Sequence, residues 1–470
     1  LPLWNSYINF GAPLAAENSC AAFYPGIAIL CLPIPFEAAY LIFLLVHLSI
    51  SAWGIVRLAR RCGATTPGAL LPMLSYPFSG YVLFQIYNPI FLIGAAWLPW
   101  AVDALLEIVL RPGTRFQSFG DKNETGQETK SPSQLRISFW DQGGPVARLA
   151  VFLSLMVLGG DPQTAYHCVI LACATWIIRM VKSLAGYLQG GKDTLHLRAV
   201  SSVGVSLGIT MLIAFLLAAI QIIPTTAYTA VSERALLKPS VSSLVPNTCK
   251  NDVHHNADKV SDTTLANTAR TRQESFWDRV IYDFSTPPYR WIEFIWPGFG
   301  GRPLPYNTRW LAALIPEGRW WTPSIYMGLF PCLLALLGLQ FWPVRNKWSV
   351  ANHVRECETK PSPACVESRS IERVRIWFSW VSIVGLLAAL GWYGPAGLLE
   401  GLQACYTQHP NTVTVLPPLG GLYWMLTHVV PGYEFFRYPS KWLVFTAMGF
   451  SILASLTVSR MDTPRIRRIT

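Results

Sequence analysis

Apolar runs long enough to cross a membrane recur along the whole 470-residue sequence. A hydrocarbon core about 30 Å thick needs about 20 mostly apolar residues per helix, because lipid offers no hydrogen-bond partner to an unpaired backbone N–H or C=O. The composition agrees, since 52% of the residues are hydrophobic and 13% are charged. We therefore predict an all-α polytopic membrane protein with about nine spans, the fourth of them short. The runs are residues 36–58, 65–84, 89–110, 146–159, 165–183, 199–223, 322–342, 375–395 and 438–458.

Basic residues gather in alternate loops between these runs. Clusters of Lys and Arg follow the first, third, fifth, seventh and ninth runs, beginning with Arg57, Arg60 and Arg61. The positive-inside rule therefore places these loops and the carboxyl end in the cytoplasm and the amino end outside. Despite a net charge of +11, this pattern does not form the basic patch with interleaved aromatic residues that is typical of nucleic-acid binding. The predicted external segments are the amino terminus and residues 85–88, 160–164, 224–321 and 396–437.

The topology divides the chain into an amino-terminal transmembrane region (1–223), a large external loop (224–321) and a carboxyl-terminal transmembrane region (322–470). The opening stretch LPLWNSYINFGAPLAAENSCAAFYP is interrupted by Pro and Gly and lacks a basic segment before an apolar core. It therefore predicts an ordered external loop that leads into the membrane, and not a signal peptide or a span. Its aromatic residues suit the lipid–water interface. Glu17 suits contact with a polar ligand, and the spacing does not decide between these uses.

The stretch GGDPQTAYH places one carboxylate, Asp161, at the outer mouth of a predicted helical hairpin. In the simpler interpretation, the glycines and Pro162 make a tight turn and Asp161 caps the next helix. Capping does not explain Gln163 and His167, which are spaced to share one helical face. An ionisable group at membrane depth also indicates a functional site. Asp161 is therefore a candidate catalytic or metal-contacting residue, with Gln163 and His167 as candidate substrate contacts.

The large external loop contains carboxylates among aromatic residues. SERAL includes Glu233 and Arg234, and WDRVIYDFSTPPYRWIEFIWPGFGGRP includes Asp278, Asp283 and Glu293. Rings beside carboxylates suit a sugar, which offers C–H faces and hydroxyl groups, but the same residues suit an amphipathic helix on the bilayer surface. Two adjacent histidines in this loop would point apart on a helix, and no further ligand is spaced to complete a metal site.

The stretch FFRYPSK lies at the predicted external start of the last span. Arg437 and Lys441 are four residues apart, which on a helix would place them on one face. Both could extend toward lipid headgroups. The positive-inside rule makes basic residues uncommon in external segments, however, so these two need a partner, and a donor phosphate is the alternative.

Four stretches, LPLWNSYINFGAPLAAENSCAAFYP, FSGYVLFQIYNPIFLIGAAWLPW, GGDPQTAYH and GYEFFRYPSKWLVF, follow one another in this order. Each resembles a recurring block of the bacterial YfhO-like membrane proteins, which are grouped with the GT-C glycosyltransferases. The resemblance implies a multi-helix bundle that uses polyprenyl-phosphate sugars and an essential acid in its first external loop. In that family a transmembrane helix precedes the LPLWN block, so we expect this sequence to be a fragment that lacks the helix and the principal acid. The family often has His at the position of Asp161.

These patterns and the resemblance together predict a glycosyltransferase in the bacterial cytoplasmic membrane. It would transfer a sugar from a polyprenyl-phosphate donor to an extracytoplasmic glycan, teichoic acid or protein. A transporter or lipid-linked sugar flippase is the alternative, and it should show paired, interrupted helices in two related halves. The sequence does not require a cofactor, and it does not decide whether a divalent cation binds at Asp161. The predicted site comprises Asp161 as the catalytic residue and Glu17, Gln163, His167, Glu233, Arg234, Arg437 and Lys441 as substrate contacts.

Overall fold

The computed structural model contains helices and no β-strand among the residues that it describes. Its chain divides into two compact units, which are described separately below. Unit 1 consists mainly of residues 18–62 and 89–222, and unit 2 of residues 2–17, 63–88 and 223–470. The described residues are 4–5, 11, 13–110, 139–188, 194–231, 281–302, 306–311, 322–341, 363–395 and 421–466.

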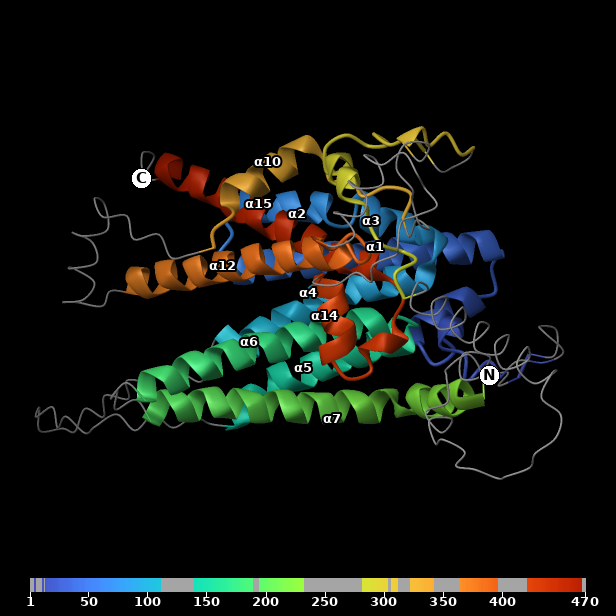
Figure 1. Cartoon of the computed structure of the whole chain (residues 1–470), viewed down its shortest axis with the longest axis horizontal. Helices are drawn as coiled ribbons and strands as arrows, with labels where there is room; N and C mark the ends of the chain where they lie inside the picture. The colour runs from blue at the N-terminus through green and yellow to red at the C-terminus, as the bar shows by residue number, and fades with distance from the viewer. Residues whose placement is uncertain are drawn as a thin grey trace, which may run out of the picture. The chain divides into compact units, whose positions relative to one another are not determined.

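Unit 1 is built around α4 (Pro89–Leu110), which packs against α1, α5 and α6 (Figure 1). Helix α4 is apolar on nearly all sides, and 78% of its membrane-length stretch is buried, as expected for a helix surrounded by others. Small residues such as Gly94, Ala95 and Ala101 allow close approach of its neighbours. The other elements of unit 1 are η1 (Asn18–Cys20), η2 (Pro25–Cys31), α1 (Phe36–Arg61), α5 (Phe139–Leu158), α6 (Pro162–Leu188) and α7 (Thr194–Val231).

Unit 2 is built around α15 (Leu443–Ile466), which packs against α2, α10 and α12. Small hydroxyl side chains join these helices, as is common where helices meet in a membrane. Ser75 Oγ donates to Ser451 Oγ (2.9 Å), and Thr446 Oγ1 donates to the carbonyl oxygen of Ser382 (3.1 Å). The remaining elements are α2 (Thr66–Ser75), α3 (Gly80–Leu83), η3 (Phe84–Tyr87), η5 (Pro288–Phe294), α10 (Leu329–Gly338), α12 (Pro363–Ala389), α14 (Leu422–Val429), η7 (Tyr433–Phe435) and η8 (Pro439–Trp442).

Five helices in the described part of the chain are long and apolar enough to cross a membrane. They confirm the predictions for 36–58, 89–110, 165–183, 199–223 and 438–458 as helices of spanning length. Run 65–84 forms two helices, α2 followed by α3 and η3, with a bend of 47° between them. The described residues therefore contain five candidate spans, or six if the bent pair is one span, and the predicted nine are not confirmed.

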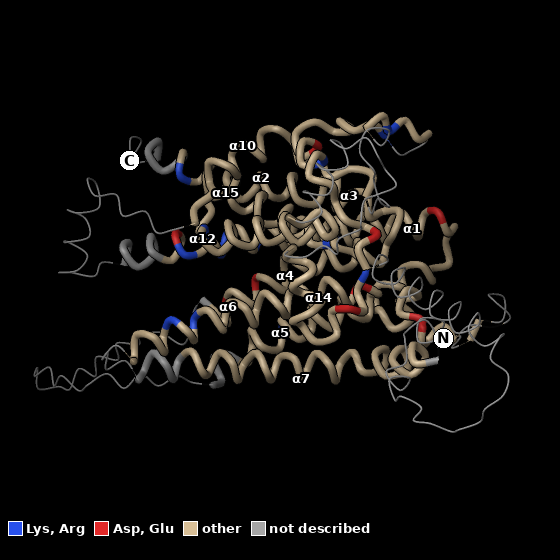
Figure 2. The backbone as a smooth tube through the Cα atoms, viewed as in Figure 1, with Lys and Arg blue, Asp and Glu red and all other residues tan. Residues whose placement is uncertain are grey.

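Three predicted runs form helices that do not reach this standard. Run 146–159 lies in α5, whose apolar part is short, as expected. Run 322–342 contains only the 10-residue α10, about 15 Å long and half of what a bilayer core needs. Run 375–395 overlaps α12, which carries Glu372, Arg373 and Arg375 within the helix. Figure 2 shows the Lys and Arg residues of α12 and α15 at the same end of unit 2.

Candidate functional site

Asp161 begins α6 as a helix cap. Helix α5 ends at Leu158, Gly160 takes a positive φ of 91°, and Pro162 is the first residue of α6. The Asp161 carboxylate accepts hydrogen bonds from the backbone N–H of Thr164 (3.2 Å) and from Thr164 Oγ1 (2.6 Å). Both oxygens thus stabilise the first turn of the helix, where backbone N–H groups have no partner inside the helix. The predicted cap geometry is present.

The side chain of Asp161 is also enclosed by α4. Only 2% of Asp161 is exposed, and a Cβ atom added at Gly94 would overlap its carboxylate. Gln163 and His167 lie one turn apart on α6 and are both buried. The structure therefore brings the three predicted residues of the GGDPQTAYH block together on the buried side of α6. Their roles in catalysis and substrate contact stay predictions.

A hydrogen-bonded chain of aromatic and imidazole groups lies elsewhere in unit 1. Trp97 Nε1 donates to the hydroxyl oxygen of Tyr24 (2.9 Å), and that hydroxyl lies 2.8 Å from His47 Nε2. Tyr24 is 4% exposed, so it does not belong to the aromatic belt predicted for the opening loop. Burial raises the pKa of Tyr24 to about 12, so this hydroxyl stays protonated at neutral pH. His47 is a polar residue within the apolar run 36–58 and was not among the predicted site residues.

The basic residues of the FFRYPSK block do not share a helical face, and that prediction was wrong. Helix η8 begins at Pro439, so Arg437 lies before the helix and only Lys441 lies within it. Tyr438 takes φ −122° and ψ 79°, outside the helical region, because a residue before proline is disfavoured there. Lys441 is 2% exposed and its Nζ lies 5.3 Å from the centre of the Tyr438 ring, whereas Arg437 is partly exposed.

Three segments that are distant in sequence meet beside Lys441. Ser440 donates its backbone N–H to the carbonyl oxygen of Phe284 (3.2 Å), and its Oγ lies 2.8 Å from Thr286 Oγ1. Thr286 in turn donates its backbone N–H to the carbonyl oxygen of Ala389 (2.9 Å). The rings of Phe284 and Tyr438 are 4.8 Å apart. A buried cation, two hydroxyl groups and aromatic rings thus gather at the start of the last candidate span.

Helix η5 contains a buried ion pair. Arg290 Nη2 donates to Glu293 Oε2 (2.8 Å) and to the carbonyl oxygen of Thr322 (3.0 Å). The two side chains are 3% and 1% exposed. Sequence analysis named Glu293 but missed Arg290, although the i, i+3 spacing of opposite charges is a known pattern for helical ion pairs.

Four buried polar atoms in and around this pair have no hydrogen-bond partner within the described part of the chain: Glu293 Oε1, Tyr289 Oη, Trp291 Nε1 and Thr322 Oγ1. Such an atom costs about 1–3 kcal/mol when nothing pairs with it. A Cβ atom added at Gly300 would lie 3.1 Å from the Tyr289 ring and 3.8 Å from Glu293 Oε1, so these two groups border one place. Glu293 Oε1 is an acceptor and the Tyr289 hydroxyl can both donate and accept, which suits ligands rich in hydroxyl groups.

The end of η5, next to Glu293, packs against the middle of a candidate span. The ring of Phe294, at the end of η5, is 6.0 Å from the ring of Phe450, which is central in Pro439–Met461. The carbonyl oxygen of Phe294 also accepts from the backbone N–H groups of Met327 (3.0 Å) and Gly328 (3.2 Å). Part of the predicted external loop therefore packs against α15. Non-helical backbone at such depth occurs where protein or a water-filled cavity covers it.

The other predicted site residues are Glu17 and residues outside the described ranges. Glu17 is exposed and belongs to unit 2, whereas Asp161 belongs to unit 1. Glu233, Arg234 and Asp278 lie outside the described residues. Within the ranges that the structure describes, no group of three or more His, Cys, Asp or Glu side chains is arranged to hold a metal ion.

Comparison with known proteins identifies no relative, since no family model, no curated protein and no solved structure matches this chain. The resemblance to the YfhO-like proteins therefore rests on the four sequence blocks alone.

Proposed function

We propose that this chain is a membrane-embedded glycosyltransferase of the YfhO-like, GT-C type. It transfers a sugar from a polyprenyl-phosphate donor to an extracytoplasmic glycan, teichoic acid or protein in the bacterial cytoplasmic membrane. The observation that carries the proposal is the buried Arg290–Glu293 pair with four unpartnered polar atoms in and around it, within the described residues. Ionisable groups buried at membrane depth are costly and are typical of functional sites.

The chemistry of sugar transfer matches these groups. Sugar hydroxyls can donate to Glu293 Oε1 and accept from Trp291 Nε1, while the hydroxyls of Tyr289 and Thr322 can do either. A leaving lipid phosphate needs a cation, and Lys441 supplies one near the start of α15. Arg437, which is partly exposed beside it, remains a second proposed phosphate contact. Asp161 stays the proposed acid of the GGDPQTAYH block, with its charge directed at Thr164.

Transport of a lipid-linked sugar is the second candidate function, and a specific observation favours it. Helices α2 and α3 form one bent pair, and interrupted helices of this kind commonly line transport sites. The buried Arg290–Glu293 pair of η5, a helix whose last residue contacts Phe450 of α15, also suits a transport path. The described residues contain one such bent pair, whereas a transporter built from two related halves would have two.

A reconstituted assay separates the two functions. Purified protein in liposomes would receive a radiolabelled polyprenyl-phosphate sugar and an acceptor, and both product formation and movement of the label across the bilayer would be followed. We expect the double variant Arg290→Gln/Glu293→Gln to lower transfer on the order of 100-fold or more. It removes both charges together, so no buried charge is left unpaired. The exposed Arg302 provides the matched control, Arg302→Gln.

The outcomes are distinct. Labelled product that depends on the ion pair supports the glycosyltransferase. Label that crosses the bilayer without forming product supports the transporter. Transfer at full rate by the double variant would remove the Arg290–Glu293 pair from the mechanism.

The orientation has its own test. Cysteines placed in residues 240–270 should react with an impermeant thiol reagent added to intact cells, and those in residues 120–135 should not. Labelling of the second set would reverse the predicted topology and move the catalytic face to the cytoplasm.

A further inference from the structure

A groove of about 520 Å³ lies on unit 1 between α1, α4 and α5. On α1 it is lined at helical spacing from Ile42 through Ser49 to Trp53. One turn beyond Trp53, on the same stripe of the helix, stands Arg57. The apolar wall that α1 gives to the groove therefore ends in a cation. The full lining is Ile42, Leu45, Val46, Ser49, Ile50, Trp53, Trp97, Trp100 and Phe152.

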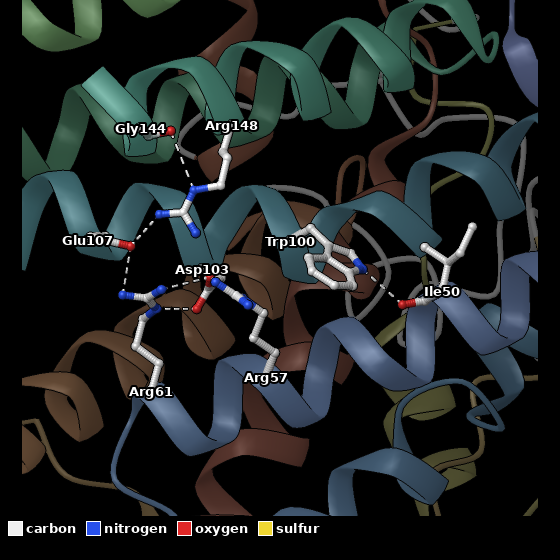
Figure 3. A network of polar contacts seen from close by, with 8 residues as sticks. All are labelled: Ile50, Arg57, Arg61, Trp100, Asp103, Glu107, Gly144 and Arg148. Carbon is white, nitrogen blue, oxygen red and sulfur yellow. Dashed lines mark hydrogen bonds and ion pairs between the residues drawn. The ribbon is translucent and has the colours of Figure 1, made fainter. Parts of the chain in front are cut away.

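The other two walls end in the same way. On α4, Trp100 is followed along its stripe by Asp103 and Glu107, and on α5 Phe152 is preceded by Arg148 one turn away. Figure 3 shows that these charged residues meet. Three apolar stripes thus lead from one groove to one cluster of charges.

The cluster is a network of three arginines and two carboxylates, and its local charge is therefore +1. Arg57 Nε donates to Asp103 Oδ2 (3.0 Å), and Arg61 pairs with Asp103 and with Glu107 (2.8 Å). Arg148 Nη2 donates to Glu107 Oε2 (2.6 Å). Asp103 is 2% exposed, so its charge is fully committed to the arginines.

Two of the arginines remain open to a further anion. The side chains of Arg57 and Arg148 are 42% and 36% exposed. Among the described residues, Arg57 donates a hydrogen bond to Asp103 through Nε alone, so its two terminal nitrogens have donors to spare. Its guanidinium also lies 5.7 Å from the centre of the Trp100 ring, which lines the groove. The spare donors and the apolar groove are therefore adjacent.

We propose that this groove binds one anionic glycerophospholipid, with an acyl chain along the groove and the phosphate at Arg57 and Arg148. The match of an apolar channel to a chain and of a net positive end to an anionic headgroup identifies the occupant. Guanidinium groups bind phosphate through paired N–H donors, which makes Arg the better residue here than Lys. The site lies on unit 1, at the end of α1 predicted to be cytoplasmic, and does not depend on the proposed sugar transfer.

Native mass spectrometry of the detergent-solubilised protein tests the site. The protein would be titrated with phosphatidylglycerol and with phosphatidylcholine of the same acyl chains. We expect tighter binding of phosphatidylglycerol, and a loss of about tenfold or more in the Arg57→Gln/Arg148→Gln variant. Ser49→Trp should weaken binding similarly, because Ser49 is exposed and a ring there fills the groove.

Lys182→Gln is the matched control, since Lys182 is an exposed cation of unit 1 on α6. This variant should bind phosphatidylglycerol like the parent protein, and thermal unfolding should verify that all variants are folded. Equal binding of the two lipids, or an equal loss in Lys182→Gln, would overturn the proposal. Glycerophosphoglycerol without acyl chains should not compete, and strong competition would reduce the site to an anion contact. If the mass spectrum instead showed a dimer of this chain, and Ser49→Trp abolished that dimer, the occupant of the groove would be a second copy of the chain.

Discussion

In unit 1 both oxygens of the Asp103 carboxylate accept hydrogen bonds from arginines, whereas in unit 2 Glu293 uses only Oε2 and leaves Oε1 without a partner in the described structure. The two carboxylates are buried to almost the same extent, 2% and 1% exposed. Their arginines differ, because Arg57 reaches the surface and Arg290 does not. Equal burial of an acid can therefore accompany a complete network or an incomplete one.

The two networks differ in what they can offer a ligand. A satisfied network stabilises the packing of its helices and has little left to offer a ligand except at its exposed edge. An incomplete one retains hydrogen-bonding capacity that a ligand or water can use. The following substitutions test this contrast, from the largest expected effect on stability to the smallest.

The largest effect is expected for Arg290→Gln. The substitution leaves the Glu293 charge buried without its partner, which costs about 3–5 kcal/mol of unfolding free energy. The double variant Arg290→Gln/Glu293→Gln should recover much of this loss. Denaturation in detergent measures both, and a single variant within about 1 kcal/mol of the parent would show that solvent reaches Glu293.

Asp103→Asn should cost less, about 2 kcal/mol, although Asp103 is equally buried. Arg61 keeps its contact with Glu107 at 2.8 Å, and Arg57 can turn to water. The same denaturation assay applies. A loss larger than that of Arg290→Gln would reverse the comparison between the two units.

Asp161 provides a third buried acid, satisfied in part by its own helix. Asp161→Ala should cost about 1 kcal/mol and Asp161→Asn almost nothing, since Asn caps a helix about as well as Asp. If the charge acts on an acceptor hydroxyl, the Asn variant should nevertheless lose sugar transfer on the order of 100-fold. Full transfer by a folded Asn variant would leave Asp161 as a cap alone.

Among the ion-pair variants, the smallest effect on stability is expected for Arg57→Gln, about 0.5 kcal/mol, because an exposed ion pair contributes little and salt screens it. Unfolding measured at low and high NaCl checks this. A loss above about 2 kcal/mol would place Arg57 among the structural residues of the network rather than at its open edge.

Local sequence signals predicted several features correctly. The apolar runs of α1, α4 and α15 have the length that a bilayer requires, and the Asp161–Thr164 cap depends on residues three apart. The prediction that Arg437 and Lys441 share a helical face was wrong, and the reason is also local. The proline at 439 breaks the helical spacing that the prediction assumed, and its effect on Tyr438 was available in the sequence.

The apolar runs in the sequence are sufficient to predict membrane-length helices, because the hydrophobic effect and backbone hydrogen bonding act on consecutive residues. Which of these helices lie inside depends on tertiary packing: 94% of the α15 span and 78% of the α4 span are buried, against 33% for α1, although the runs look alike. Packing also brings Asp103 to Arg57, 46 residues away, and the end of η5 to Phe450 of α15. Such pairings depend on which helices pack together, and no spacing within one helix encodes them.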